Sequence, residues 1–294
     1  MLFRTRRPLT DVKLSSIYSK CVASPVHFQQ EGQKGMSNMN PYETPKADLT
    51  KPSGSFLLTY PKAVSADRGW NWVAEGFGYF KKDPGAWILT IIVYSVLSLV
   101  LSFIPIIGQI ALILISDVIM AGFMIGCRAQ SMGENFEVKY LFAGFSNNPG
   151  RLVLLSIVPL FGVLLVIGIV MGPSLFTAME LVSQPESTDK SLQIAESMKN
   201  MVLPFLIVMM FAIPLSMAVL FAPALIALND QPLIQAMKLS FTGCLKNILP
   251  FLLWSIIALI LSILGCIPLL LGLLAVVPTL IASIYAAYHD IFIE

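Results

Sequence analysis

The sequence predicts an all-α, polytopic membrane protein with about six transmembrane helices, paired into three hairpins that each follow a short amphipathic helix. Two observations predict this fold class. Only 12% of the 294 residues are charged and 56% are hydrophobic, whereas about a quarter of the residues in a soluble domain are charged. The apolar residues also form blocks about as long as the ~20 residues that a helix needs to cross a bilayer. We therefore expect the lipid bilayer to be the first partner of this chain.

Residues 1–68 contain no such block and are rich in Pro, Ser, Lys and Asn, a composition typical of disorder. We expect them to form a disordered cytoplasmic tail. Its first arginines are followed by no apolar core, so a signal peptide is not expected. Within the tail, Lys34-Gly35 can be encoded by a purine-rich ribosome-binding sequence at a suitable distance before Met39. This predicts that translation begins after Met1 and that residues 1–35 are not part of the protein.

A membrane domain, residues 69–294, is expected after the tail. Its predicted spans are residues 86–107, 109–128, 151–173, 200–228, 249–267 and 269–288. So few residues separate the first two spans, and the last two, that each pair must form a tight hairpin. A polar extracytoplasmic loop is expected at about 174–199.

Most of the basic residues near the ends of the spans fall on one side of this topology. They are Arg68, Lys81, Lys82, Arg128, Lys139, Arg151, Lys238 and Lys246. The polar loop on the opposite side holds Lys190 and Lys199, but also Glu180, Glu186, Asp189 and Glu196. Because Lys and Arg accumulate on the cytoplasmic side of membrane proteins, we expect both termini to be cytoplasmic.

One unit is predicted three times: an amphipathic helix, a break, then a hairpin. The apolar stripes of the three helices are Trp70, Val73, Phe77 and Phe80; Val138, Leu141, Phe142 and Phe145; and Leu233, Met237, Phe241, Cys244 and Leu245. The breaks are Asp83-Pro84, Asn148-Pro149, and Asn247 with Pro250. Asp83 is expected to cap the first span and Pro84 to occupy its first turn.

We expect these amphipathic helices to lie in the cytoplasmic interface. Lys238, on the polar face of the third, and Phe241, on its apolar face, are the candidate contact residues. All three copies begin on the same side, so the repeats are expected to be parallel.

Asp117 is the ionisable residue well inside a predicted span, and such residues are candidate functional sites. Aligning Ala121-Gly122 with Ala282-Ser283 places Asp117 on Pro278, so the fold itself does not require an acid there. Two interpretations stay open: a residue that lines a transport pathway, or a carboxylate that caps a helix break.

Pro214 and Pro223 are the candidate helix breaks of the fourth span, because prolines free backbone carbonyl groups that neighbouring helices or water must satisfy. The alternative is that they only shape the packing. A second group, the aromatic residues near span ends, is expected to anchor the chain at the membrane surface. They are Trp70, Trp72, Trp87, Tyr285, Tyr288 and His289.

No motif of a known catalytic or nucleotide-binding site occurs. The two histidines and four cysteines are too scattered to suggest a metal site or a disulfide framework. A net charge of +2 does not favour nucleic acid as a partner. We therefore expect no enzymatic activity, no catalytic residue, no cofactor and no bound metal.

Several short motifs are distinctive. They are Asn40-Pro41-Tyr42, Arg68-Gly69-Trp70-Asn71-Trp72, Gly122-Phe123-Met124, Cys127-Arg128, Leu141-Phe142-Ala143-Gly144-Phe145, Pro223-Ala224-Leu225 and Tyr288-His289-Asp290-Ile291-Phe292. Through them the chain resembles a family of uncharacterised proteobacterial multi-pass inner-membrane proteins. In layout it is also similar to the membrane domains attached to some glycerophosphodiester phosphodiesterases, but it lacks their catalytic domain. The resemblance implies a bacterial cytoplasmic membrane and no particular activity.

Two functions remain as hypotheses. The first is a non-enzymatic scaffold or lipid-organisation factor that contacts another membrane protein or a second copy through its amphipathic helices. The alternative is a small transporter or channel, in which Asp117 and the broken fourth span line a pathway.

Overall fold

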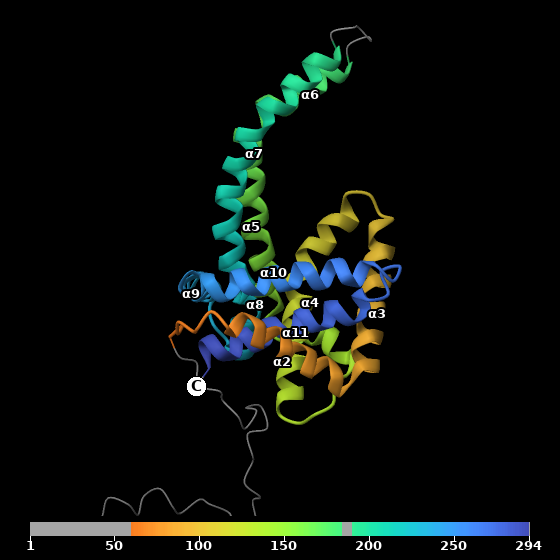
Figure 1. The fold of residues 1–294 in the computed structure, drawn as a ribbon, viewed down its shortest axis with the longest axis vertical. Coiled ribbons are helices and arrows are strands. Elements are labelled where there is room, and N and C mark those ends of the chain that lie inside the picture. The colour runs from red at the N-terminus through yellow and green to blue at the C-terminus, as the bar shows by residue number, and fades with distance from the viewer. Residues whose placement is uncertain (1–59, 184–189, 294) are drawn as a thin grey trace, which may run out of the picture. The chain divides into compact units, whose positions relative to one another are not determined.

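A computed structural model describes residues 60–183 and 190–293, and every element below belongs to these ranges (Figure 1). Most of the predicted tail, with its proposed start, lies outside them. The elements in chain order are α2 (Arg68–Lys82), α3 (Pro84–Ser102), α4 (Ile107–Ser131), the 3-10 helix η1 (Val138–Ser146), α5 (Pro149–Val170), α6 (Gly172–Ser183), α7 (Lys190–Leu220), α8 (Ala222–Asn229), α9 (Leu233–Lys246), α10 (Ile248–Cys266) and α11 (Leu273–Phe292).

Six stretches of these helices are long and apolar enough to cross a membrane. They are Pro84–Ser102, Ile107–Ser131, Pro149–Val170, Ala195–Asn229, Ile248–Cys266 and Leu273–Phe292. The fourth stretch combines most of α7 with α8. The predicted class, an all-α polytopic membrane protein, is confirmed for the described residues.

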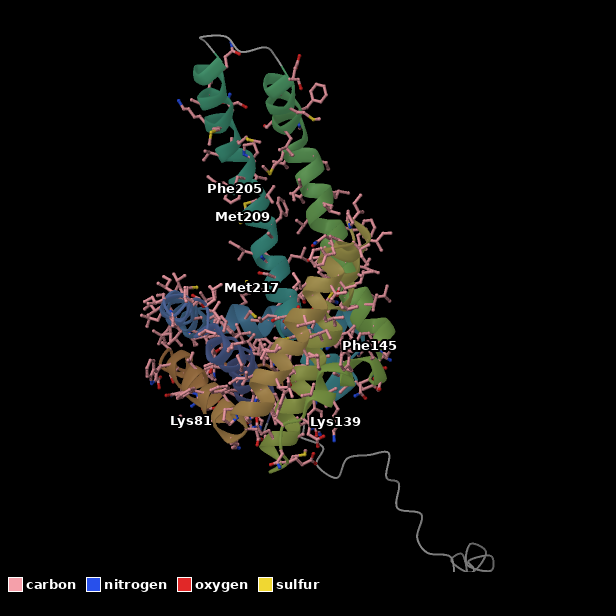
Figure 2. The ribbon with its side chains drawn as sticks, turned by 90° about the vertical axis from the view of Figure 1, so that its right-hand side faces the viewer. Lys81, Lys139, Phe145, Phe205, Met209 and Met217 are labelled. Carbon is pink, nitrogen blue, oxygen red and sulfur yellow. The ribbon has the colours of Figure 1, made fainter. Side chains whose placement is uncertain are left out.

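Consecutive span helices lie side by side as pairs: α3 with α4, α5 and α6 with α7, and α10 with α11. Figure 1 shows α10 and α11 running across the direction of α5 and α7. Figure 2, turned by 90°, shows the blue C-terminal helices nearly end-on, which agrees with that crossing. The hairpins are therefore splayed around a shared centre rather than packed as one parallel bundle.

The predicted polar loop at 174–199 is wrong in its conformation. Helix α6 continues to Ser183 and α7 begins at Lys190, so most of this stretch is helical. The physical reason is its content of good helix formers, with Pro173 in the first turn of α6, where proline is tolerated. Polarity does mark one face of each helix: the cleft between them is lined by Ser174, Thr177, Gln193, Glu196, Ser197 and Asn200.

The second predicted amphipathic helix is η1, a 3-10 helix rather than an α-helix. It buries Leu141 and Gly144, while Phe142 and Phe145 remain exposed. Gly144 lies so close to α4 that a Cβ there would be 2.0 Å from the carbonyl oxygen of Val118. Contact with α4 therefore decides which side of this short helix is buried.

Pro84 lies in the first turn of α3, as predicted, and Pro149, predicted as part of a break, lies in the first turn of α5. The predicted cap by Asp83 is wrong, because its side chain makes no capping hydrogen bond. Its carboxylate instead accepts hydrogen bonds from the backbone N–H of Phe136, at 2.9 Å, and from Nε2 of Gln130, at 3.1 Å. Tertiary partners satisfy this carboxylate in place of its own helix.

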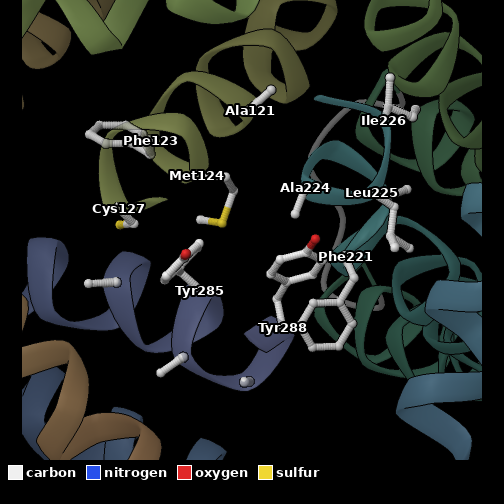
Figure 3. Packing of buried hydrophobic residues seen from close by; sticks show 14 of the residues in the cluster. Ala121, Phe123, Met124, Cys127, Phe221, Ala224, Leu225, Ile226, Tyr285 and Tyr288 are labelled. Atoms are coloured by element: carbon white, nitrogen blue, oxygen red, sulfur yellow. The ribbon is translucent and has the colours of Figure 1, made fainter. Parts of the chain in front are cut away.

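Four of the six aromatic residues expected at the membrane surface are buried. They are Trp72, Trp87, Tyr285 and Tyr288, and all belong to the core. Figure 3 shows the part of this core where side chains from α4, α8 and α11 converge. Trp70, at 60%, and His289 are exposed. The buried indoles keep partners: Nε1 of Trp72 donates to Asp290 at 3.0 Å and Nε1 of Trp87 to Gln130 at 3.4 Å. Amphipathic aromatic residues suit a polar core position as well as an interface, which explains the error.

The short helices α2, η1 and α9, which we call the leader helices, each pack on the hairpin before them in a cycle. Helix η1 packs on α4, α9 on α7, and α2 on α11, so the first leader closes onto the last hairpin. A Cβ at Gly76 of α2 would lie 2.3 Å from the carbonyl oxygen of Thr279. The predicted repeat alignment pairs Thr279 with Val118, which is the residue that Gly144 approaches. The same close approach therefore recurs at equivalent places.

The break residues repeat this cycle. Each one forms hydrogen bonds with the chain segment just before the next leader helix. Asp83 accepts from Phe136 N at 2.9 Å, and Asn148 Nδ2 donates to Asp230 Oδ1 at 3.0 Å. Asn247 accepts from Val64 N and donates to Lys62 O, both at 2.8 Å. Lys62 N also donates to Ile291 O at 3.0 Å. Residues 60–67, placed in the tail by the sequence, thus take part in the folded unit.

Candidate functional site

Asp117 lies half-buried on α4, facing α5. Its Oδ2 accepts a hydrogen bond of 2.7 Å from the hydroxyl of Ser156, which is itself buried. Asp117 does not line the polar cleft between α6 and α7, nor any of the three other cavities among the described helices. The geometry therefore gives this carboxyl group a helix-to-helix link, and within residues 60–183 and 190–293 no ion pair involves it.

The fourth span breaks at one place. Helix α7 continues through Pro214 and ends at Leu220, and α8 begins at Ala222 with Pro223 in its first turn. Pro223 thus lies at a break, whereas the predicted break at Pro214 is wrong. Lipid-facing helices tolerate an internal proline when neighbouring groups compensate for the lost hydrogen bond.

A side chain that the sequence interpretation did not single out repairs the break. Ser240 of α9 donates its hydroxyl to the carbonyl oxygen of Met217 at 2.7 Å and accepts a hydrogen bond from the backbone N–H of Phe221 at 3.0 Å. Both bonds are formed by a fully buried residue. The hydroxyl thus bridges the two backbone groups that an unbroken helix would join directly.

A signal for Ser240 was present in the repeat pattern. Ser240 and Gly76 stand at the same distance before the first residues of the following span helices, Ile248 and Pro84. Both lie against the second helix of the preceding hairpin. The chain therefore places a small residue wherever a leader helix crosses a span, and here that residue also carries a hydroxyl.

Helix α9 presents a different face to the protein from the one its apolar stripe suggested. Its buried residues are Ala236, Leu239, Ser240, Gly243 and Cys244. Phe241 is only half-buried, and Lys238 is exposed. Burial raises the pKa of the Cys244 thiol to about 12, so this cysteine is inert at neutral pH. The candidate contact pair therefore lies on the outer side of α9.

Polar bonds fix α2 onto the end of α11. Nε of Arg68 lies 2.6 Å from Oδ2 of Asp290, and Nη2 lies 3.0 Å from Glu75. Burial disfavours the charge on Arg68, but the hydrogen bond and attraction from Asp290 outweigh it and raise the pKa of the guanidinium group. Because Trp72 donates to the same carboxylate oxygen, this network holds the leader helix in one orientation.

An apolar groove runs between α2, α10 and α11, and we call it the α2 groove. Its volume is about 320 Å³. It is lined by Trp70, Val73, Ala74, Phe77, Ile257, Leu261, Ala275, Val276 and Thr279. The hydroxyl of Thr279 donates to Ala275 O at 2.7 Å, so the groove offers a ligand an apolar surface.

A second apolar groove, of about 360 Å³, lies between α5 and α7 and includes Pro214. We call it the α5–α7 groove. A much smaller cavity of about 10 Å³ is bounded by the ends of α4, α8 and α11, where Nη1 of Arg128 donates to Leu228 O at 3.2 Å. Among residues 60–183 and 190–293, no group of His, Cys, Asp or Glu could hold a metal ion.

Comparison with known proteins supports the membrane assignment. The chain is similar to a protein of Burkholderia thailandensis named "Probable inner membrane protein", with 28% identity over 232 residues that cover 76% of this chain and 82% of the relative. No family model matches the chain, and no solved structure matches it. Together with the six apolar helices, the similarity makes the chain a multi-pass inner-membrane protein.

Proposed function

We propose that this protein is a non-enzymatic scaffold or lipid-organisation factor of the inner membrane, with both termini in the cytoplasm and the leader helices as its contact surface. The observation that carries the proposal is the exposed cation on each leader helix. Lys81, Lys139 and Lys238 are all exposed on elements whose opposite sides are packed against spans. Figure 2 shows Lys81 and Lys139 near the end of the folded unit that is remote from α6.

The fixed attachment of the leader helices supports a binding surface rather than a moving part. Small residues let α2 and η1 touch the backbone of the spans, and Ser240 ties α9 to α7. A surface held this rigidly loses little conformational entropy when it binds a partner. Cationic groups next to a membrane also attract anionic lipids.

The transporter hypothesis has less support in the geometry. Buried side chains, among them Phe221, Tyr285 and Tyr288, fill the centre where the three hairpins meet (Figure 3). Asp117 accepts a hydrogen bond from Ser156, which links α4 to α5. No observation on the described residues favours a polar pathway between the hairpins.

Site-specific photo-crosslinking in cells tests the proposal. A benzophenone amino acid at position 238 or 241 should form discrete adducts with a protein or with lipid, whereas one at Ile260, an exposed apolar residue of α10, should give lipid adducts only. In parallel, full-length protein in proteoliposomes should show no flux of protons or small solutes. Flux that Asp117→Asn abolishes would favour the transporter instead.

A further inference from the structure

The α2 groove is closed along one side by the leader helix rather than by spans alone. Trp70, Ala74 and Phe77 of α2 line it, and these positions lie on one face of an α-helix. Trp70 and Phe77 remain exposed, at 60% and 42%. An elongated apolar molecule lying in the groove would therefore cover aromatic surface that the protein itself leaves open.

A cation continues the same face of α2. Lys81 follows Phe77 by one helical turn, and its Nζ lies 4.5 Å from the centre of the Phe77 ring. Among the residues that the structure describes, no carboxylate lies within ion-pair distance of Lys81. Glu75 of the same helix is paired with Arg68 on another side. An unpaired ammonium group thus stands at the edge of an apolar groove.

The α5–α7 groove provides an internal comparison. It is of similar size and equally apolar, but it is lined only by residues of two span helices, which are Gly162, Val163, Val166, Val208, Phe211, Ala212, Pro214, Leu215 and Ala218. None of these lining residues is charged. Any lipid chain there would be held by apolar contact alone, without selection of a headgroup.

We propose that the α2 groove is a binding site for one anionic phospholipid, with an acyl chain between α2, α10 and α11 and the phosphate beside Lys81. The chemistry fits at both ends, because methylene groups meet an apolar lining and the anionic headgroup meets the cation. This inference rests on the lipid-organising form of the proposed function and assigns it a site. It requires no movement of α2, which Arg68 and Trp72 hold in place.

Native mass spectrometry of the full-length protein tests the site. Delipidated protein is mixed with phosphatidylglycerol or with phosphatidylcholine of the same chains, and the bound fractions are compared. Lys81→Gln should lower the preference for phosphatidylglycerol about fivefold, the contribution of one lysine near anionic lipid. Lys199→Gln, which removes the same charge from an exposed position on α7, should leave that preference unchanged.

A second pair of variants tests the apolar part of the site. Ala74→Trp should remove one bound lipid of either type by filling the groove from an exposed position, while Ala212→Trp in the α5–α7 groove should not alter headgroup preference. Phosphatidylglycerol brominated in its acyl chains should also quench tryptophan fluorescence less in Trp70→Phe than in the unmodified protein. Circular dichroism and gel filtration show whether each variant is folded.

Three results would overturn the inference: an unchanged preference in Lys81→Gln, a retained lipid in Ala74→Trp, or equal quenching in Trp70→Phe. These outcomes can be told apart from failure of the proposed function. Discrete protein adducts at position 238 together with unselective lipid binding would refute the groove and leave the scaffold in place.

Discussion

Ser240→Ala offers the sharpest test of how the broken fourth span is held. The substitution removes the hydroxyl that donates to Met217 O at 2.7 Å and accepts from Phe221 N–H at 3.0 Å. It leaves the small volume of the position almost unchanged. Any loss of stability therefore reports the hydrogen bonds rather than a cavity.

The expected loss is about 1–3 kcal/mol, the cost of leaving a buried polar group without a partner. The lost stability should not double, because Met217 O keeps a contact with Sγ of Cys244 at 3.5 Å. Met217 O and Phe221 N–H can also approach each other as i and i+4 groups of one helix. Hydrogen bonds between membrane helices average only about 0.6 kcal/mol. A value near 1 kcal/mol is therefore our central expectation.

Reversible unfolding in detergent micelles, followed by circular dichroism, measures this loss. Thr242→Ala is the matched control, because the Thr242 hydroxyl donates at 2.8 Å only to Lys238 O of its own helix. It should change the free energy of unfolding by less than about 0.5 kcal/mol, as is usual for a surface substitution. Equal stability of the two variants would refute the role given to Ser240.

Three further predictions concern other contacts. Gly76→Ala should destabilise the protein by at least about 1 kcal/mol, because its Cβ would lie 2.3 Å from Thr279 O. Gly78→Ala, in the same helix with open space around it, should be neutral or stabilising by up to about 1 kcal/mol. Unfolding curves that show the reverse order would contradict the packing of α2 on α11. In Asp117→Asn the side-chain oxygen can still accept the hydrogen bond from Ser156, so the free energy of unfolding should change by less than about 1 kcal/mol. A larger loss would mean that the negative charge itself stabilises the fold. Maleimide at pH 8 should modify the exposed Cys266 within minutes but Cys244 only after unfolding. Burial raises the pKa of Cys244 to about 12, which leaves almost no thiolate at pH 8. Rapid modification of Cys244 in folded protein would show that α9 does not pack as described.

The sequence predicted the properties that belong to single segments. A span is recognisable because hydropathy summed over about 20 residues exceeds the cost of insertion, and Pro84 and Pro149 mark helix starts because proline restricts its own backbone. The small residues of the repeat, such as Gly76 and Gly144, were visible in the sequence, but their common role was not. That role depends on which helix each one touches.

The candidate site was only partly predictable for the same reason. Periodicity placed Lys238 on the outside of a leader helix, but it placed Phe241 on the apolar face, whereas the structure leaves Phe241 half-buried on the outer side of α9. The repeat pattern marks Ser240 only as a small residue equivalent to Gly76, and nothing in the sequence shows that its hydroxyl has a bonding role. Its importance comes from two backbone groups on a helix about twenty residues away, at a break that the sequence placed at Pro214 as well as at Pro223.

By itself, the sequence determined that this chain is a membrane protein of six apolar helices, because transfer of a segment into lipid depends mainly on that segment's composition. Only the tertiary structure decided that Trp72, Trp87, Tyr285 and Tyr288 are buried, and that each leader helix packs on the hairpin before it. Amphipathic side chains are equally suited to a membrane surface and to a polar core, so their position depends on the neighbours that the fold brings to them.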